Sequence, residues 1–209
     1  MTITTTNINK MEGHYVHKGT QDNTNYIVTE NEPYENSSLT HRRSVFHANK
    51  EFFVLVDELY MKNPEEAYNT GKYNLNFNLC APENEITFDN SNSKAAHGIH
   101  TNYSDNNNIV IYTSSEDYDS SATFKSNVSN DHGVVNIENR LGYKISLRKN
   151  KDRKTIRAIT VIYPTSNPTG TTINAEFTDG GYTGKAVAIK VTVNGTPYEL
   201  SYTIPENNN

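Results

Sequence analysis

The 209-residue sequence has one cysteine, no tryptophan and no long apolar run. Because Cys80 has no second cysteine to pair with, an internal disulfide and a cysteine-based metal cluster are excluded. No apolar run approaches the roughly 18 residues that indicate a membrane-spanning helix. Residues 1–10 are rich in threonine and asparagine and lack the basic and then apolar pattern of a signal peptide. The composition therefore excludes disulfide-stapled domains and helical membrane proteins.

The sequence is also short of basic residues. It has 19 Lys and Arg against 24 Asp and Glu, which gives a formal net charge of -5. A general binder of nucleic acid or of anionic membranes would show a basic surplus or stripe, so we expect neither partner. A local basic patch for an acidic polysaccharide remains compatible with this charge balance.

Short strand patterns separated by turn residues dominate the chain. In residues 73–79, tyrosine, leucine and phenylalanine alternate strictly with asparagine, which is typical of a half-buried strand. The sequence Asn194-Gly195 between two apolar segments is a strong hairpin signal. Strands are expected at 2–8, 26–30, 73–79, 85–88, 99–103, 109–113, 122–125, 134–138, 143–148, 154–163, 173–177, 187–193 and 198–204, in addition to a central pair. We predict an all-β fold, an antiparallel β-sandwich of about a dozen strands.

Little helix is expected in this fold. Residues 63–67 begin Asn-Pro and are predicted to form at most a short helical turn, because proline suits the first position of a helix. The segment around Gly13 and Gly19 is predicted to be a loop.

The central pair of strands lies within residues 39–58. Phe52 to Val56 is an apolar run of strand length, and the turn Ala48-Asn49-Lys50 reverses the chain before it. In an antiparallel hairpin the two outer ends meet. The residues His41-Arg42-Arg43 should therefore lie beside Asp57-Glu58.

These ends supply the main candidate for a binding site. Arginine recognises carboxylate and sulfate groups through its planar fork, so His41, Arg42 and Arg43 are the predicted substrate-binding residues. Strand alternation sends His41 and Arg43 to one face and Arg42 to the other. The competing interpretation is structural, in which Arg43 forms an ion pair with Asp57 or Glu58.

Other polar groups carry weaker signals. The pairs His14/His17 and His97/His100 have too few converging partners for a zinc site, and we predict no metal. Residues 105–108 lack EF-hand spacing and are predicted to form a tight turn. The acids at 116, 117 and 119 lie in one predicted loop rather than across a cleft. Neither a Gly-rich phosphate loop nor a nucleophile elbow is present, and no cofactor is expected.

The central hairpin also carries a family resemblance. The sequence His-Arg-Arg-Ser-Val-Phe, a short turn and then Phe-Phe-Val-Leu-Val-Asp-Glu resembles the C-terminal β-domain of the heparinase II/III-like polysaccharide lyases, most of all the heparinase III group. Segments 28–34, 73–79 and 159–164 resemble other parts of that domain. The resemblance implies one β-sandwich at 1–177. Residues 178–209 lie outside the resemblance and are predicted to add a C-terminal β-hairpin to the same sandwich.

The resemblance carries expectations about function. Such lyases cleave uronic-acid glycans of the heparan-sulfate type by β-elimination, and most of their catalytic residues belong to an N-terminal α/α-toroid domain. The remaining histidine and metal ligands belong to a His-x-His-x-Asp type motif that this sequence lacks. The resemblance therefore implies a non-catalytic portion of such an enzyme, which packs against the toroid and forms part of the substrate-cleft wall.

By the same resemblance the isolated chain is expected to be inactive and to come from a longer, periplasmic or secreted protein. Two alternatives remain. One is a free-standing carbohydrate-binding module for acidic glycans, and the other is a purely structural sandwich.

Overall fold

The computed structural model describes residues 12–32, 39–61, 72–89, 96–115, 119–126, 140–148 and 155–206. These residues form fourteen strands and two single turns of 3₁₀-helix, at Glu83–Glu85 and Pro168–Gly170. The predicted all-β antiparallel fold is therefore confirmed. The strands are β1 Glu12–Gln21, β2 Thr24–Glu32, β3 Leu39–Ala48, β4 Phe52–Met61, β5 Lys72–Pro82, β6 Ile86–Asp89, β7 Ala96–Thr101, β8 Asn108–Ser115, β9 Asp119–Ser126, β10 Arg140–Arg148, β11 Thr155–Thr165, β12 Ile173–Phe177, β13 Ala186–Val193 and β14 Thr196–Thr203.

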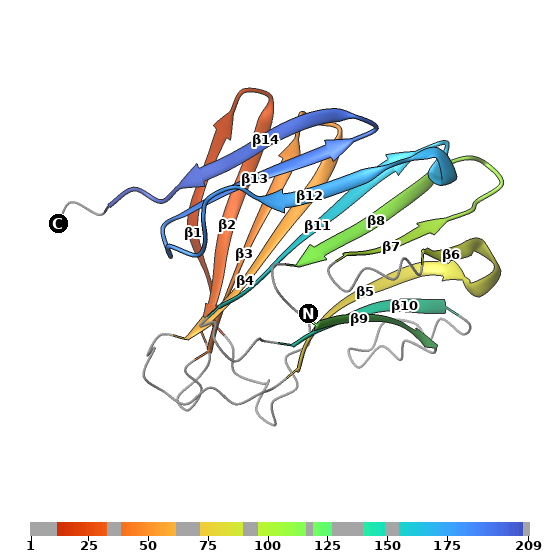
Figure 1. The fold of residues 1–209 in the computed structure, drawn as a ribbon, viewed down its shortest axis with the longest axis horizontal. Coiled ribbons are helices and arrows are strands. Elements are labelled where there is room, and N and C mark those ends of the chain that lie inside the picture. The colour runs from red at the N-terminus through yellow and green to blue at the C-terminus, as the bar shows by residue number, and fades with distance from the viewer. Residues whose placement is uncertain are drawn as a thin grey trace.

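Eight strands form the main sheet, in the order β1-β2-β3-β4-β11-β8-β7-β6. All neighbouring pairs in it are antiparallel. The late strand β11 lies between β4 and β8 and joins the two halves of the sheet (Figure 1).

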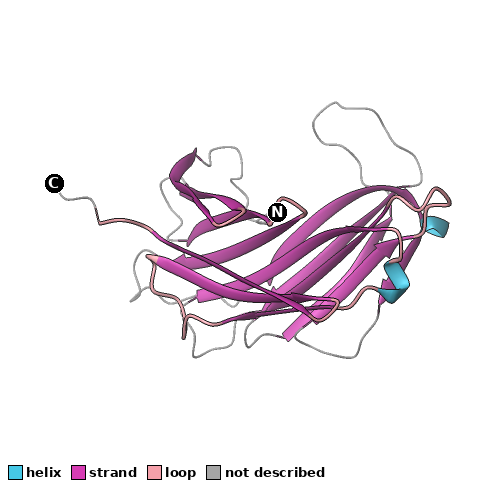
Figure 2. Ribbon diagram, turned by 90° about the horizontal axis from the view of Figure 1, so that it is seen from above, coloured by secondary structure: helices cyan, strands magenta, loops and turns pink. Residues whose placement is uncertain are grey.

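Two three-stranded sheets accompany the main sheet, with the orders β12-β13-β14 and β5-β10-β9. In Figure 1 the β12–β14 sheet crosses above the main strands and the β5–β10–β9 sheet lies below them. Figure 2 shows the same layered arrangement from above, with the two 3₁₀ turns at one end of the strands. We call the face of the main sheet that packs on β12–β14 the inner face, and the opposite face the outer face.

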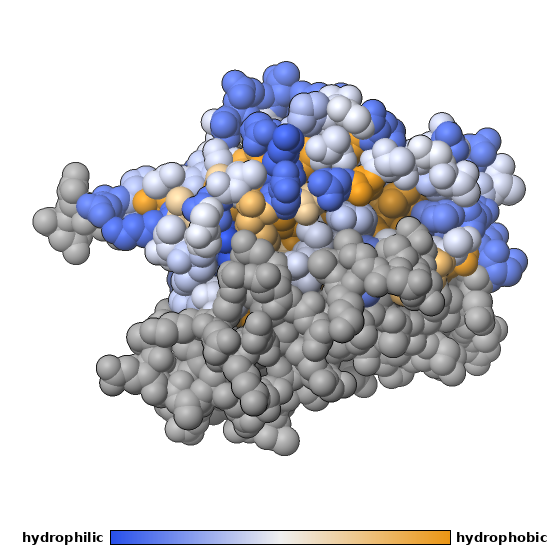
Figure 3. Space-filling view, in the orientation of Figure 1, coloured by the Kyte–Doolittle hydropathy of each residue, from blue (hydrophilic) through white to orange (hydrophobic). Residues whose placement is uncertain are grey.

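One large part of the core lies between the inner face and the β12–β14 sheet. Alternate residues of β13 are buried, as expected for a strand with one face on the core. The main sheet contributes Phe46, Phe52, Val54, Val56 and Ile159, all fully buried, and the opposing sheet contributes Val187, Ile189, Val191, Leu200 and Tyr202. Each such side chain contributes about 1.5–3 kcal/mol when it is removed from water. In the space-filling view, apolar surface is visible as a band across the middle of the described residues, with polar residues above it (Figure 3).

Both predicted hairpins are present. Strands β3 and β4 pair along their whole length, and the turn between them places Asn49 and Lys50 at φ angles of 50° and 60°. The turn between β13 and β14 places Asn194 at 50° and Gly195 at 82°. Two consecutive positive φ angles are the geometry of the tight turn that matches the twist of a hairpin.

The loop prediction around Gly13 and Gly19 was wrong, because these residues belong to the edge strand β1. A Cβ atom on Gly19 would lie 2.3 Å from the hydroxyl of Tyr26 on β2, so only glycine leaves room for that ring. The predicted elements at 2–8, 63–67 and 134–138 lie outside the described residues.

The division into residues 1–177 and 178–209 remains a prediction. The structure pairs β12, from the first part, with β13, from the second part, in one sheet. Both parts also contribute to the same core cluster.

Candidate functional site

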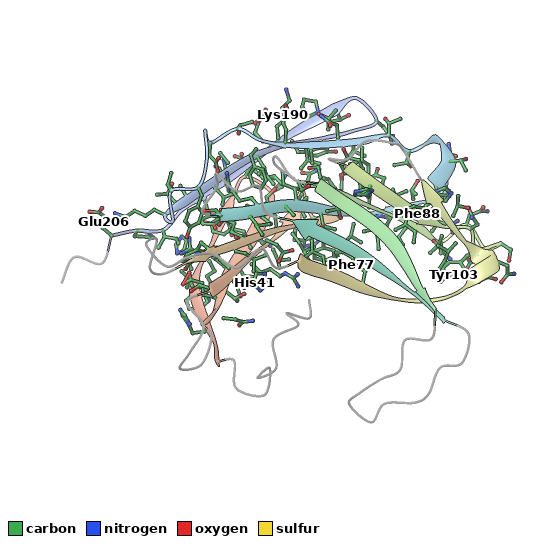
Figure 4. All side chains as sticks on the ribbon, turned by 60° about the horizontal axis from the view of Figure 1, so that its bottom comes forward. His41, Phe77, Phe88, Tyr103, Lys190 and Glu206 are labelled. Carbon is green, nitrogen blue, oxygen red and sulfur yellow. The ribbon has the colours of Figure 1, made fainter. Side chains whose placement is uncertain are left out.

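The His-Arg-Arg sequence lies at one end of β3, where alternation divides it between the two faces of the main sheet. Arg42 is the cross-strand partner of Glu58, and Arg43 is the partner of Asp57. The prediction that the basic residues of β3 lie beside the acidic residues of β4 is therefore confirmed. Arg42 and Glu58 point to the inner face, whereas His41, Arg43 and Asp57 point to the outer face. Figure 4 turns the molecule so that the side bearing β9 and β10 comes forward, and it labels His41.

The outer cluster consists of His41, Arg43 and Asp57. His41 Nε2 lies 2.6 Å from Asp57 Oδ1, and Arg43 donates to both carboxylate oxygens at 2.7 and 3.1 Å. Burial alone would raise the pKa of Asp57, but the hydrogen bond from His41 and the charge of Arg43 outweigh it, and the pKa is lowered. The Asp57 side chain is fully buried and that of His41 is 7% exposed, whereas that of Arg43 is 28% exposed. Arg43 is therefore the most accessible member of this cluster.

On the inner face, Arg42 is held by several partners. It donates to Glu30 Oε2 through two nitrogens, at 2.9 and 2.7 Å, and to the carbonyl oxygen of Gly184 at 2.6 Å. The hydroxyl of Tyr60 donates to the same Glu30 oxygen at 2.6 Å. Each guanidinium nitrogen of Arg42 thus donates to a protein oxygen, and the side chain is 7% exposed.

A second buried arginine, Arg157 on β11, lies beside this group. It donates to Glu58 Oε1 at 3.0 Å and makes a bidentate contact with Asp179, which follows β12. The guanidinium carbon lies 3.8 Å from the centre of the Phe177 ring, a cation-π contact. We call Glu30, Arg42, Glu58, Arg157 and Asp179 the inner cluster.

Of the three acids in the inner cluster, Glu58 has the fewest hydrogen-bond partners. Burial raises its pKa from 4.5 to about 7, against the opposing effects of the positive charges on Arg157 and Arg42. Its Oε2 atom is buried and has no hydrogen-bond partner. Glu58 pairs with Arg157, on its own face, and Asp57 is the acid that pairs with Arg43.

Four further members of this site were not predicted from the sequence, namely Glu30, Tyr60, Arg157 and Asp179. Arg157 carried a usable signal, since it interrupts the apolar run Ile156-Arg157-Ala158-Ile159 in a strand buried on both faces. A charge in such a position requires a buried partner. The identity of that partner depends on contacts between distant segments, which no local pattern encodes.

The other candidate groups are placed as follows. Residues 105–108 form the predicted turn, in which Asp105 Oδ1 accepts from the Asn107 amide at 3.0 Å. His97 and His100 lie on β7 and pair with different residues of β8. His14 approaches Glu30 at 3.8 Å, and His17 lies 3.3 Å from the Tyr26 hydroxyl. In the parts of the chain that the structure describes, no three His, Cys, Asp or Glu residues converge as metal ligands.

The outer face of β1–β4 also exposes apolar side chains. Tyr15 is 55% exposed, Ile27 42% and Phe53 44%. Tyr15 lies in the same cross-strand row as Arg43, with Thr29 between them, and Phe53 stacks on His47 at 4.7 Å between ring centroids. The three exposed side chains thus share one face of the sheet but lie in three different cross-strand rows. Within the described residues, no helix has the length and apolarity to cross a membrane.

The fold and site define an antiparallel β-sandwich whose central hairpin carries paired charges on both faces. The comparisons with known proteins identify its family. The model of the heparinase II/III-like C-terminal family matches residues 6–175, and the chain belongs to this family.

The chain is similar to heparin-sulfate lyases over most of its length. It is 38% identical over 201 residues to the heparin-sulfate lyase of Bacteroides thetaiotaomicron, and 29% identical over 187 residues to that of Bacteroides stercoris. These matches cover 95% and 87% of this chain. A crystal structure of heparinase III superposes with a TM-score of 0.73 at 34% identity over 91% of the chain. A heparan sulfate lyase mutant of Pedobacter heparinus shares the fold, with a TM-score of 0.70 at 20% identity over 94% of the chain.

The chain spans about a quarter of the length of these relatives. It covers 26% and 25% of the two curated lyases, and 27% and 29% of the two solved chains.

Proposed function

We propose that this chain is the non-catalytic β-sandwich portion of a polysaccharide lyase that cleaves heparan-sulfate-like uronic-acid glycans by β-elimination. The observation that carries the proposal is the match of residues 6–175 to the C-terminal family, together with 38% identity to about a quarter of a heparin-sulfate lyase. In this role the sandwich is a scaffold and a wall of the substrate cleft. By itself it is expected to be inactive.

The outer face is the proposed wall of the cleft. Of the three residues predicted to bind substrate, Arg43 has the most exposed side chain, and the buried Asp57 fixes both Arg43 and His41 in position. A guanidinium held in this way can present its remaining donors to a carboxylate or sulfate group of the glycan. Arg42 is bonded to Glu30 and Gly184 on the other face, which supports a structural role for it.

The proposed partner of this face is the α/α-toroid domain of a parent enzyme. Tyr15, Ile27 and Phe53 provide exposed apolar side chains on this face for such a contact, and Tyr15 lies in the same cross-strand row as Arg43. By resemblance, we propose a periplasmic or secreted location for the parent enzyme.

A chimera tests the proposal. The matching quarter of the Bacteroides thetaiotaomicron lyase is replaced by this chain, and the chimera is assayed on heparan sulfate and heparin by the ultraviolet absorbance of the unsaturated uronate product. We expect an active chimera, no activity from this chain alone, and no activity from the relative without its sandwich. A chimera that folds and remains inactive would contradict the scaffold role.

Point variants of the same chimera test the outer face. Arg43→Lys keeps a positive charge but removes the planar fork, and we expect a higher KM with little change in kcat. Phe53→Ser should weaken the contact between the domains and lower the thermal stability of the chimera. Lys190→Ala, on β13 and away from the outer face, is the control and should leave both values unchanged.

The alternative function is a free-standing binding module for acidic glycans. The observation that favours it is the common exposed face of Tyr15, Phe53 and Arg43. In affinity electrophoresis through gels that contain heparan sulfate or alginate, a binding module would be retarded, and Tyr15→Ala would reduce the retardation. The scaffold proposal predicts no retardation of the isolated chain.

A further inference from the structure

The inner cluster fastens the β12–β14 sheet to the main sheet. Arg42 on β3 bonds the carbonyl of Gly184, and Arg157 on β11 bonds Asp179. Asp179 in turn accepts from the amides of Gly181 and Ala188, at 3.1 and 3.2 Å. The two arginines therefore hold both ends of the connection between β12 and β13.

Two tyrosines, one by a ring contact and one by a hydrogen bond, add to the same attachment. The ring of Tyr182, in this connection, lies 5.0 Å from the ring of Tyr60 on β4. The hydroxyl of Tyr202 on β14 accepts from Ser44 Oγ on β3 at 2.9 Å.

The charges of the inner cluster do not balance when all its members are ionised. Three carboxyl groups (Glu30, Glu58 and Asp179) face two guanidinium groups (Arg42 and Arg157). Glu30 accepts from two nitrogens of Arg42 and from Tyr60, and Asp179 accepts from two nitrogens of Arg157 and from two amides. Each of these two acids therefore receives at least three hydrogen bonds.

Glu58 is left as the unmatched acid. It receives one hydrogen bond, from Arg157 Nε, and its second oxygen is buried without a partner. A buried carboxylate oxygen without a donor is costly, whereas a protonated carboxyl removes the excess negative charge. The remaining groups around the cluster are the hydroxyls of Tyr60, Tyr182 and Tyr202, and His14, whose side chain is 49% exposed and lies near Glu30.

We propose that Glu58 is a proton-dependent latch between the two sheets. With its proton, the carboxyl leaves the inner cluster neutral and the β12–β14 sheet closely attached. When the proton is lost, the cluster carries an uncompensated negative charge, and residues 178–186 open more often because opening lets water reach Glu58. The latch is independent of any activity on glycans.

Hydrogen exchange followed by mass spectrometry tests the latch. At about pH 5.5 and about pH 8, protection of residues 178–186, corrected for intrinsic exchange at each pH, should fall on the order of ten-fold at the higher pH. The strands β7 and β8, which lie away from the inner cluster, should change much less. A uniform fall over the whole fold would overturn the latch, because Glu58 would then act on global stability alone.

Two variants identify the responsible group. Glu58→Gln removes the titration and should abolish the difference between the two pH values. Glu176→Gln removes a carboxylate from the exposed side of β12 and should keep the difference. An equal pH response in wild type and Glu58→Gln would overturn the proposal.

A direct measurement remains decisive should Glu58→Gln fail to fold. With carboxyl-labelled glutamate, carbon NMR of the wild-type protein should show one glutamate that titrates near neutral pH, in step with the exchange change. Absence of such a glutamate would overturn the proposal.

Discussion

Arg42 and Arg43 are consecutive residues of β3, yet their guanidinium groups lie on opposite faces of the main sheet and bond different acids. Arg42 donates to Glu30 on the inner face, and Arg43 donates to Asp57 on the outer face. One short sequence therefore contributes to two separate groups of charges, the inner cluster that attaches the β12–β14 sheet and the outer cluster around the buried Asp57.

Removal of the Arg157 side chain should destabilise the fold strongly. Arg157→Ala leaves Glu58 and Asp179 buried without their shared partner, and we expect a loss of about 3–5 kcal/mol in the free energy of unfolding. Urea denaturation followed by circular dichroism measures the change. Lys18→Ala, at an exposed position of β1, is the matched control and should change stability by no more than about 0.5 kcal/mol. Equal stabilities of the two variants would contradict the structural role of the inner cluster.

Asp57 should control how the protein responds to acid. Its folded-state pKa lies below the ordinary value of 3.8. The carboxylate therefore contributes stability that is present above that value and is lost as the pH falls through the folded-state pKa. Asp57→Asn should cost about 1.5–3 kcal/mol at neutral pH and should flatten the loss of stability in acid. The test is the free energy of unfolding of the wild type and of Asp57→Asn, measured across the acid range. Parallel curves for these two proteins would contradict the role of Asp57.

The core shared by the two sheets should behave as one unit. Ile189 on β13 is fully buried, and Ile189→Ala should cost about 2–5 kcal/mol. Ile27→Ala makes the same chemical change at a side chain that is 42% exposed, and its cost should be much smaller. Both variants should unfold in one transition by circular dichroism. A second transition in Ile189→Ala would indicate that the C-terminal strands unfold separately.

The turn between β13 and β14 should require glycine. Gly195 has a φ angle of 82°, and a Cβ atom added there would meet no atom within 4 Å, so the cost of a side chain is conformational rather than steric. Gly195→Ala should therefore lose about 1–2 kcal/mol. Asn194→Gly, at the adjacent position with φ of 50°, should be tolerated. Differential scanning calorimetry of the two variants compares these costs.

Features encoded by neighbouring residues could be predicted from the sequence. The apolar run at Phe52 to Val56, the turn at Asn49 and the pair Asn194-Gly195 each specify local geometry, and the corresponding hairpins are present. The β12 strand was placed at its observed residues, 173–177. These elements follow from side-chain alternation and from turn residues that accept positive φ angles.

Features that depend on distant contacts could not be predicted in the same way. Gly13 and Gly19 indicated a loop, but the edge position of β1 and the ring of Tyr26 make glycine suitable for a strand there. Asp179 is 22 residues from Arg157, and Gly184 is 142 residues from Arg42. Their pairing depends on how the β12–β14 sheet folds back over β3 and β11, which no single segment specifies.

The position of β11 in the main sheet also determines the order in which the fold can be completed during synthesis. Strands β4 and β8 are both made before β11, and each lacks one of its two neighbours in the sheet until residues 155–165 leave the ribosome. Until then the two halves of the sheet present unpaired edges, which are sites of aggregation in a nascent chain. Completion of the main sheet therefore waits for β11, which follows the seven other strands of that sheet in the chain.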